Sequence, residues 1–241
     1  MEFIIKDTYD EASNAAADII AAQIKEKPAC VLGLATGSTP IGTYAELVNK
    51  VKHGEISFKD VTTFNLDEYD GLDGEHDQSY RYFMNKHLFD LVDIDKSKTH
   101  VPSGTSDDPA KMCENYETSI DAAGGLDLQL LGLGHNGHIG FNEPADEFPV
   151  QTHHVQLTKS TIEANSRLFN SIDEVPKAAY TMGIGTIMKA KKILLIATGE
   201  GKAEIVAKAF KGEITPQVPA SILQSHADAT IVLDKEAAKL L

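Results

Sequence analysis

The residue types best suited to proton transfer gather between Gly132 and Pro144, a stretch that reads GLGHNGHIGFNEP after an apolar run at 126–131. Imidazole titrates nearest to neutral pH, and a carboxylate beside it orients the ring and favours its charged form. Glycines let the backbone turn sharply and approach a ligand closely. The stretch therefore predicts an acid–base site at a strand end, with His138 and Glu143 as the proton-transfer pair.

Two adjacent carboxylates, Asp67 and Glu68, follow another apolar run in the segment NLDEYDG at 65–71. Burial at the rim of a sheet raises the pKa of a carboxyl group, so one of them could act as a general base. Taken alone, the segment fits an acidic turn or a cation site at least as well. Chemistry by itself does not choose between Asp67 and Glu68.

The loop TGSTP at 36–40 follows a strand-like run and opens a helical pattern. Free N–H groups at a helix N-terminus form an anion cradle, which makes Gly37, Ser38 and Thr39 candidate phosphate ligands. Thr39 is the expected N-cap and Pro40 the expected first helical residue. The alternative is a well-capped turn that binds nothing.

Lys202 and Arg167 are the candidate cationic ligands for such a phosphate. Lys202 lies in TGEGK at 198–202, and a lysine at a helix N-terminus is unfavourable unless an anion is bound beside it. The chain has only two arginines, Arg81 and Arg167, and a bidentate phosphate clamp must draw on that pair. Read singly, Lys202 fits a solvated surface lysine equally well, and Arg167 fits a solvated or ion-paired arginine better than a ligand.

Two other uses of the glycine loop are disfavoured. GLGHNG at 132–137 matches the dinucleotide pattern G-x-G-x-x-G, but Pro144 and Pro149 interrupt the helix that must follow, and the segment at 151–157 supplies no acid for a ribose. No HExxH pattern or cysteine set accompanies the histidines, so no metal site is expected. His135, His153 and His154 are interpreted as structural or surface residues.

Composition restricts the remaining function classes. With 241 residues, 42% of them hydrophobic, the chain can bury a substantial core. A net charge of −14 argues against a general nucleic-acid binder, and no run approaches the ~18 apolar residues of a membrane span. Cys30 and Cys113 are expected to be buried free thiols, consistent with a reducing cytoplasm.

Apolar runs alternate with amphipathic helical patterns along the chain. Strands are predicted at 3–5, 30–34, 61–65, 126–131, 153–157, 193–197 and 230–233. Helices are predicted at 8–26, 41–52, 78–90, 107–122, 160–168, 200–211 and 235–240. This alternation predicts an α/β fold, a Rossmann-like open and mostly parallel sheet with helices on both faces. No linker divides the chain, so residues 1–241 are expected to form a single domain.

Five segments together carry a resemblance to a known family. They are LGLATGSTP (32–40), TFNLDEYDGL (63–72), GLGHNGHIGFNEP (132–144), ANSRLF (164–169) and TGEGKA (198–203). Spaced in this order they are far more specific than any one glycine motif. On these segments the chain resembles the glucosamine-6-phosphate deaminase (isomerase) family over essentially its full length.

The resemblance implies conversion of glucosamine 6-phosphate and water to fructose 6-phosphate and ammonia, in amino-sugar catabolism, without cofactor or metal. Asp67 looks like the base that moves the proton from C2 to C1, which would settle the choice against Glu68. His138 looks like the base for ring opening, assisted by Glu143 and Asn136. The implied phosphate ligands are Gly37, Ser38, Thr39, Arg167 and Lys202, and the segment at 157–177 resembles an active-site lid.

Two departures from the family pattern bear on mechanism and regulation. Some members carry Asp where this chain has Asn136, and an amide can only form hydrogen bonds there. The longer, hexameric members bind an N-acetylglucosamine 6-phosphate effector through basic residues, whereas this chain has His153 and Val155 in place of Arg and Lys and ends at Leu241. We therefore expect no allosteric activation, and a monomer or small homo-oligomer whose only partner is its small-molecule substrate.

Three rival interpretations remain. A 6-phosphogluconolactonase resembles this family in fold and glycine-rich loop, but lactone hydrolysis does not need the Asp base of NLDEY. A sugar-phosphate-sensing regulator would carry a DNA-binding helix-turn-helix segment. An inactive paralogue would not be expected to keep Asp67, His138 and Glu143 together.

Replacing the proposed base gives the first prediction. Asp67→Asn should lose several orders of magnitude in turnover with glucosamine 6-phosphate and still bind it, because general-base catalysis is typically worth about 10²–10⁴-fold. Steady-state kinetics and a binding titration check this. A variant that keeps more than about a tenth of the wild-type rate would exclude Asp67 as the base.

The absence of an effector site gives the second prediction. Rate against substrate concentration should be hyperbolic and indifferent to added N-acetylglucosamine 6-phosphate. Sigmoidal kinetics relieved by that compound would show that the basic residues missing at positions 153 and 155 are not required for activation.

Overall fold

A seven-stranded parallel sheet forms the centre of the computed structural model, which describes residues 1–166, 169 and 171–241. Its strands, in spatial order, are β1 (Glu2–Lys6), β10 (Ala229–Asp234), β9 (Lys192–Ala197), β6 (Leu128–Leu131), β2 (Val31–Leu34), β3 (Thr62–Asn65) and β5 (Thr99–His100). Every neighbouring pair is parallel. Strands of such a sheet are covered on both faces, which is why β2 and β6 are buried throughout.

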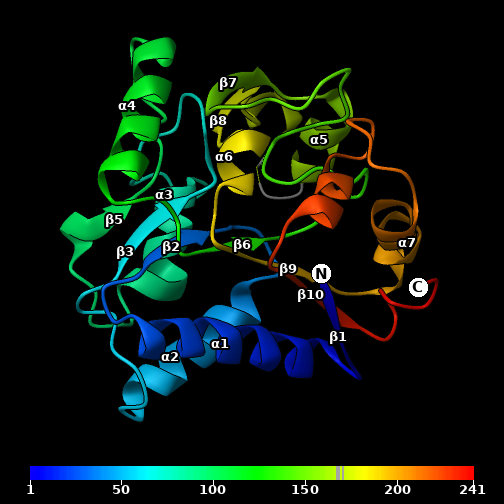
Figure 1. The fold of residues 1–241 in the computed structure, drawn as a ribbon. Coiled ribbons are helices and arrows are strands. Elements are labelled where there is room, and N and C mark those ends of the chain that lie inside the picture. Colours follow the sequence, from blue (N-terminus) through cyan, green and yellow to red (C-terminus); the bar gives the residue numbers. More distant parts are fainter. Residues whose placement is uncertain (167–168, 170) are drawn as a thin grey trace.

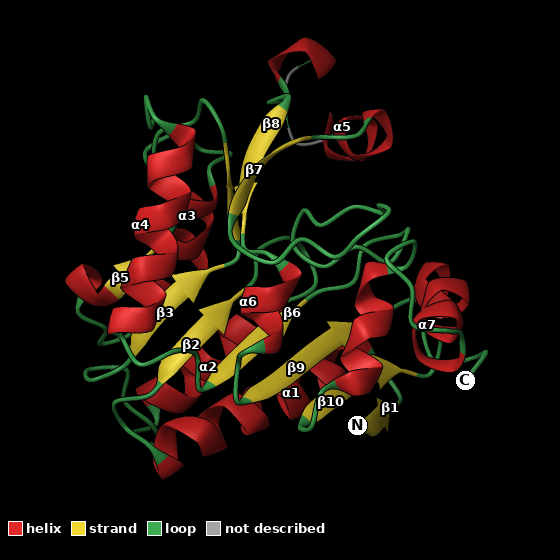
Figure 2. Ribbon diagram, turned by 45° about the horizontal axis from the view of Figure 1, so that its top comes forward, coloured by secondary structure: helices red, strands yellow, loops and turns green. Residues whose placement is uncertain are grey.

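Helices lie on both faces of this sheet, which confirms the predicted α/β class (Figure 1). One face carries α1 (Tyr9–Glu26) and α2 (Ile41–Lys52), and the other carries α4 (Pro109–Ala122), α6 (Ile184–Met188) and α7 (Ala203–Lys211) (Figure 2). The pattern at 78–90 forms the short helix α3 (Tyr80–Met84), which continues as a π-helical turn over Asn85–Phe89.

The strand order reverses between β2 and β6, and this reversal locates the functional end of the sheet. From β2 the chain proceeds through α2 towards β3, whereas from β6 it proceeds in the opposite direction towards β9. Right-handed crossovers place these two connections on opposite faces. A crevice therefore opens beyond the carboxyl ends of β2 and β6, where open α/β sheets bind their ligands.

A second, antiparallel sheet stands on this crevice and was not foreseen from the sequence. It contains β4 (Asp67–Tyr69), β8 (Ala178–Thr181) and β7 (His153–Gln156) in that order (Figure 2). Only the last of these strands was predicted, as 153–157. The chain passes from β3 to β4 through Leu66, whose N–H donates to Leu34 of the large sheet and whose carbonyl accepts from Met182 beside the small one. Asp67 therefore begins β4 at the corner between the two sheets.

Two local predictions were wrong. Residues 235–240 form turns instead of a helix, because the Asp234 carboxylate accepts from the N–H groups of Ala237 and Gly199 and fixes a tight turn after β10. Thr39 is not an N-cap: α2 begins at Ile41, Pro40 occupies the cap position, and no side chain caps the helix. The helix α5 (Lys159–Asn165) starts one residue before the pattern predicted at 160–168, and α7 lies within its predicted pattern but starts after a 3₁₀ turn.

Both cysteines are free and buried, as predicted. Burial raises the pKa of the Cys30 thiol to about 12, so this residue is a small core side chain with little thiolate. Within the described part of the chain, no helix is both long and apolar enough to cross a bilayer.

Candidate active site

A cavity of about 390 Å³ occupies the crevice at the carboxyl ends of β2 and β6. Three segments that are distant in sequence form its walls: the loop after β2, the corner at Asp67, and the glycine loop after β6. Six of the residues selected from the sequence line it, namely Gly37, Ser38, Thr39, Asp67, His138 and Lys202. Further lining comes from Tyr80, Phe141, Thr161 and Asn165.

The other selected residues lie elsewhere. Asn136 and Glu143 do not line the cavity and lie behind His138, which does. Arg167 lies outside the described residues. His135 is exposed, as expected for a surface residue, yet it also lines the cavity, a position that the sequence did not indicate.

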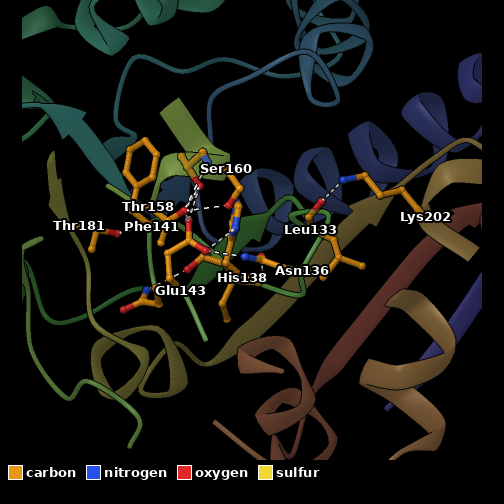
Figure 3. Close-up of polar contacts among 12 residues, drawn as sticks. Leu133, Asn136, His138, Phe141, Glu143, Thr158, Ser160, Thr181 and Lys202 are labelled. Atoms are coloured by element: carbon orange, nitrogen blue, oxygen red, sulfur yellow. Dashed lines mark hydrogen bonds and ion pairs between the residues drawn. The ribbon is translucent and has the colours of Figure 1, made fainter. Parts of the chain in front are cut away.

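His138, Asn136 and Glu143 form one connected polar group (Figure 3). The Nδ1 atom of His138 lies 3.5 Å from Oε2 of Glu143. Asn136 joins the two, since its Nδ2 donates to the same Oε2 at 2.5 Å and its Oδ1 accepts from the backbone N–H of His138 at 3.2 Å. The amide at position 136 therefore acts through hydrogen bonds alone, as its chemistry requires.

Glu143 is held in its ionised form. Burial alone would raise its pKa, but His138 and the donors Thr161 and Asn136 outweigh burial and lower the pKa to about 2. A carboxylate held 3.5 Å from Nδ1 orients the ring, and His138 lines the cavity. The ring is thereby placed to act as an acid or a base towards a group bound in the cavity.

Asp67 has the opposite environment. Its side chain is 6% exposed and, in the part of the chain that the structure describes, its carboxylate accepts no hydrogen bond. Desolvation, with a smaller repulsion from Glu68, raises its pKa to about 8. A carboxyl group with this pKa is a much stronger base than an exposed aspartate once it is ionised.

Glu68 does not line the cavity, and its carboxylate binds backbone N–H groups instead. Its carboxylate accepts from the N–H groups of Tyr69, Tyr80 and Arg81, each at 2.9 Å. The last two belong to the first turn of α3, whose N-terminus attracts an anion. Side chains alternate along a strand, so adjacent carboxylates on β4 face different partners. The geometry assigns Asp67 to the cavity and Glu68 to α3.

Two tyrosine hydroxyls fix the loop after β2, and the sequence analysis missed both. Tyr44 donates to the carbonyl of Ala35 at 2.5 Å, and Tyr9 donates to the carbonyl of Thr39 at 3.1 Å. The carbonyl oxygens of the loop are thus engaged from the side of α1 and α2. Gly37, with φ of +94°, turns the chain there in a conformation that side chains rarely adopt.

Lys202 brings a cation to the same cavity. Its Nζ donates to the carbonyl of Leu133 at 2.6 Å, and among the described residues no carboxylate lies within ion-pair distance of it (Figure 3). Burial lowers its pKa. An ammonium group that is partly desolvated and lacks a counter-ion is suited to bind an anion.

Glycine is required at position 134 for the ring of His138 to fit. A Cβ atom built there would lie 2.3 Å from the Nε2 atom of His138. The end of the loop is fixed to β8, because Thr181 Oγ1 accepts from Phe141 N–H at 2.9 Å and Asn142 donates to the carbonyl of Met182 at 2.9 Å. The glycine loop is therefore a close-packed support for the ring.

Comparison with known proteins decides the family. The family model described as glucosamine-6-phosphate isomerases/6-phosphogluconolactonase matches residues 6–232. The chain belongs to this family. Among family relatives, a glucosamine-6-phosphate deaminase of Clostridium perfringens is 54% identical over 241 residues, covering all of both chains. A glucosamine-6-phosphate deaminase of Thermoanaerobacter pseudethanolicus is also 54% identical and is covered over 95% of its length.

Solved structures of glucosamine-6-phosphate deaminases and of 6-phosphogluconolactonases differ in how similar they are to this chain. A monomeric glucosamine-6-phosphate deaminase superposes with a TM-score of 0.97 at 48% identity, with full coverage of both chains. The 6-phosphogluconolactonase of Trypanosoma brucei gives a TM-score of 0.77 at 21% identity, covering 100% of this chain and 98% of its own. The second likeness concerns the fold alone, so within the family this chain is similar to the deaminases in sequence as well as fold.

The close contact at Gly134 gives the third prediction. Gly134→Ala should reduce kcat by at least about tenfold, because the new methyl group overlaps the His138 ring and a displaced base loses proton transfer worth about 10²–10⁴-fold. Steady-state kinetics measures the loss, and circular dichroism confirms that the variant is folded. A folded variant with unchanged kcat would mean that the ring position is not important.

The raised pKa of Asp67 gives the fourth prediction, on stability. Between the unfolded pKa near 3.8 and the native value near 8, the native protein retains a proton that the unfolded chain has released. The contribution of Asp67 to stability therefore falls as the pH rises through that window, and then levels off. Asp67→Asn, which cannot ionise, should become more stable than the wild type by a margin that grows from pH 5 to pH 8.

Urea unfolding at several pH values measures this margin. The exposed carboxylate variant Asp60→Asn serves as the control and should show no such trend. A margin for Asp67→Asn that does not change with pH would contradict the raised pKa.

Proposed function

We propose that this protein is a glucosamine-6-phosphate deaminase, which converts glucosamine 6-phosphate and water to fructose 6-phosphate and ammonia. The observation that carries the proposal is that three features meet at one cavity. They are the loop of Gly37, Ser38 and Thr39, a buried Asp67 carboxyl group with no hydrogen-bond partner among the described residues, and the His138–Glu143 pair. The 54% identity to full-length deaminases supports the choice of substrate.

The phosphate group is the anchor in this proposal. Backbone N–H groups and hydroxyls at Gly37, Ser38 and Thr39 receive it, and Lys202 neutralises part of its charge. Arg167 is proposed as a further ligand by its match to the family motif. Anchoring at the phosphate end converts the later proton transfers into steps within one positioned complex.

Ring opening is the first chemical step that we assign. His138 accepts the proton of the anomeric hydroxyl, the bond from C1 to the ring oxygen breaks, and that oxygen takes up a proton. Glu143 stabilises the imidazolium that forms, because its carboxylate lies 3.5 Å from the ring nitrogen on the far side. Asn136 keeps that carboxylate in place through the bond at 2.5 Å.

Enolisation follows on the open-chain aldehyde. Ionised Asp67 removes the proton from C2 while the aldehyde oxygen takes up the proton that the C2 ammonium group releases, which gives an enolamine. Asp67 then delivers its proton to C1, the double bond moves from C1–C2 to C2–N, and a protonated imine remains at C2. Water adds to that imine, and ammonia departs as the ketone forms. The low exposure of Asp67 favours this role, since a partly dry carboxylate removes a carbon-bound proton more readily than a solvated one.

The proposal also covers domain organisation, a lid, the oligomeric state and the cellular location. We infer that residues 1–241 act as a single domain, in keeping with the family match over 6–232. The segment at 157–177 is proposed as a lid, since Thr161 and Asn165 already line the cavity. A monomer is the proposed state, because the 48% identical deaminase is described as monomeric. A cytoplasmic location, with no metal or cofactor required, stays a prediction.

The deciding experiment supplies glucosamine 6-phosphate to the purified protein without metal or nucleotide and follows ammonia and fructose 6-phosphate together. Equimolar products are expected. A parallel reaction contains 6-phosphogluconolactone, and hydrolysis there without ammonia in the first reaction would replace the deaminase by the lactonase. Inactivity in both reactions, with binding retained, would favour a sugar-phosphate sensor.

The unpaired cation gives the fifth prediction. Lys202→Ala should raise KM for glucosamine 6-phosphate by about tenfold or more, because a hydrogen bond to a charged group is worth about 1.5–3 kcal/mol. Inorganic phosphate should also inhibit the variant less than the wild type. The control is Lys208→Ala, an exposed lysine on α7, which should leave KM unchanged. Equal KM values for the wild type and Lys202→Ala would remove Lys202 from the phosphate site.

A further inference from the structure

Glu143 has two carboxylate oxygens, and each is held by a different part of the chain. Oε2 faces His138 and accepts from Asn136. Oε1 accepts from the hydroxyl group of Thr161, which belongs to α5. An ionised carboxylate has no proton to give, so Thr161 is necessarily the donor in that bond. The orientation of Glu143 is therefore set from both sides.

Thr161 is well placed to fix the carboxylate. It is 3% exposed and its hydroxyl also accepts from Thr158 Oγ1 at 3.0 Å, so its own proton remains directed towards Glu143. Thr158 is itself the N-cap of α5 and accepts from the backbone N–H of Thr161 at 3.3 Å. The two threonines and the first turn of α5 therefore form one hydrogen-bonded unit that ends on the carboxylate.

No other described group replaces this donor at Oε1. Thr158 Oγ1 is 3.4 Å from the same oxygen, which is long for a hydroxyl bond. Without the Thr161 hydroxyl, the carboxylate would keep its partners at Oε2 and lose its close partner at Oε1. It could then rotate about its last carbon–carbon bond, which would move Oε2 away from His138.

We propose that Thr161 is a positioning residue for the deaminase reaction, and that its hydroxyl holds the Glu143 carboxylate against His138 for ring opening. This role rests on the proposed function. It differs from a phosphate-binding or substrate-binding role, although Thr161 also lines the cavity. The sequence places Thr161 eighteen residues from Glu143 with no motif linking them, and only the fold brings them together.

The variant Thr161→Val tests the proposal, because it removes the hydroxyl and keeps the branched shape. We expect kcat to fall by about tenfold or more, with KM within about threefold of the wild type, since the lost bond is to a charged group that acts after binding. Thr161→Ser, which restores the donor, should recover most of the rate. Ser160→Ala is the matched control on the same turn, because its exposed hydroxyl, among the described residues, contacts Thr158 alone.

A double-mutant cycle shows whether Thr161 acts through Glu143. In a Glu143→Gln background, Thr161→Val should cause little further loss of kcat, because the group that it positions is already gone. Losses that multiply across the two sites would overturn the proposal, and so would a raised KM with unchanged kcat, which indicates direct contact with substrate.

A crystal structure of Thr161→Val gives a test that does not depend on turnover. The Glu143 carboxylate should leave its place 3.5 Å from His138 Nδ1, whereas in Ser160→Ala it should stay there. An unmoved carboxylate in Thr161→Val would overturn the positioning role, even if kcat fell. If the wild type releases no ammonia at all, the proposed function fails, and this structural comparison still decides whether Thr161 fixes Glu143.

Discussion

The burial of Asp67 without a hydrogen-bonding partner among the described residues is the constraint around which the site is arranged. A carboxyl group in this position is disfavoured as an ion, and its pKa of about 8 expresses that cost. The corner between the two sheets places it there, because Leu66 is hydrogen-bonded to Leu34 of the large sheet and to Met182 beside the small one. The fold thus keeps the Asp67 carboxyl group out of water, which would otherwise return its pKa to the ordinary value.

The same desolvation acts on Glu143 and gives the opposite result. Glu143 receives hydrogen bonds from Asn136 and Thr161 and faces a basic ring, so its pKa falls to about 2. The pKa values of these two carboxyl groups, beside one cavity, therefore differ by several units because their partners differ. This separation lets one remain a fixed anion while the other gains and loses a proton, a division of roles that acid–base enzymes commonly use.

Much of this arrangement was predictable from the sequence, and what was missed has physical reasons. Apolar runs such as those of β9 and β10 predicted the parallel sheet, and the glycine loop indicated His138 and Glu143 as site residues. The strands β4 and β8 were missed because three or four residues give too little periodicity to recognise, and with them the corner that buries Asp67 was missed. Tyr9 and Thr161 act through tertiary contacts for which no local pattern exists.

The pairing of the first strand with the last has a consequence for how the chain is made. β1 is an edge strand, and its only strand neighbour in the described sheet is β10, with Glu2 opposite Thr230 (Figure 1). During synthesis β1 therefore has no strand to join until residues 229–234 have left the ribosome. Its exposed Phe3 and Ile5 remain unpaired for that interval, the circumstance in which nascent chains associate wrongly or recruit chaperones. The sheet can be completed at this edge only as a late event, after the crevice between β2 and β6 has had time to form.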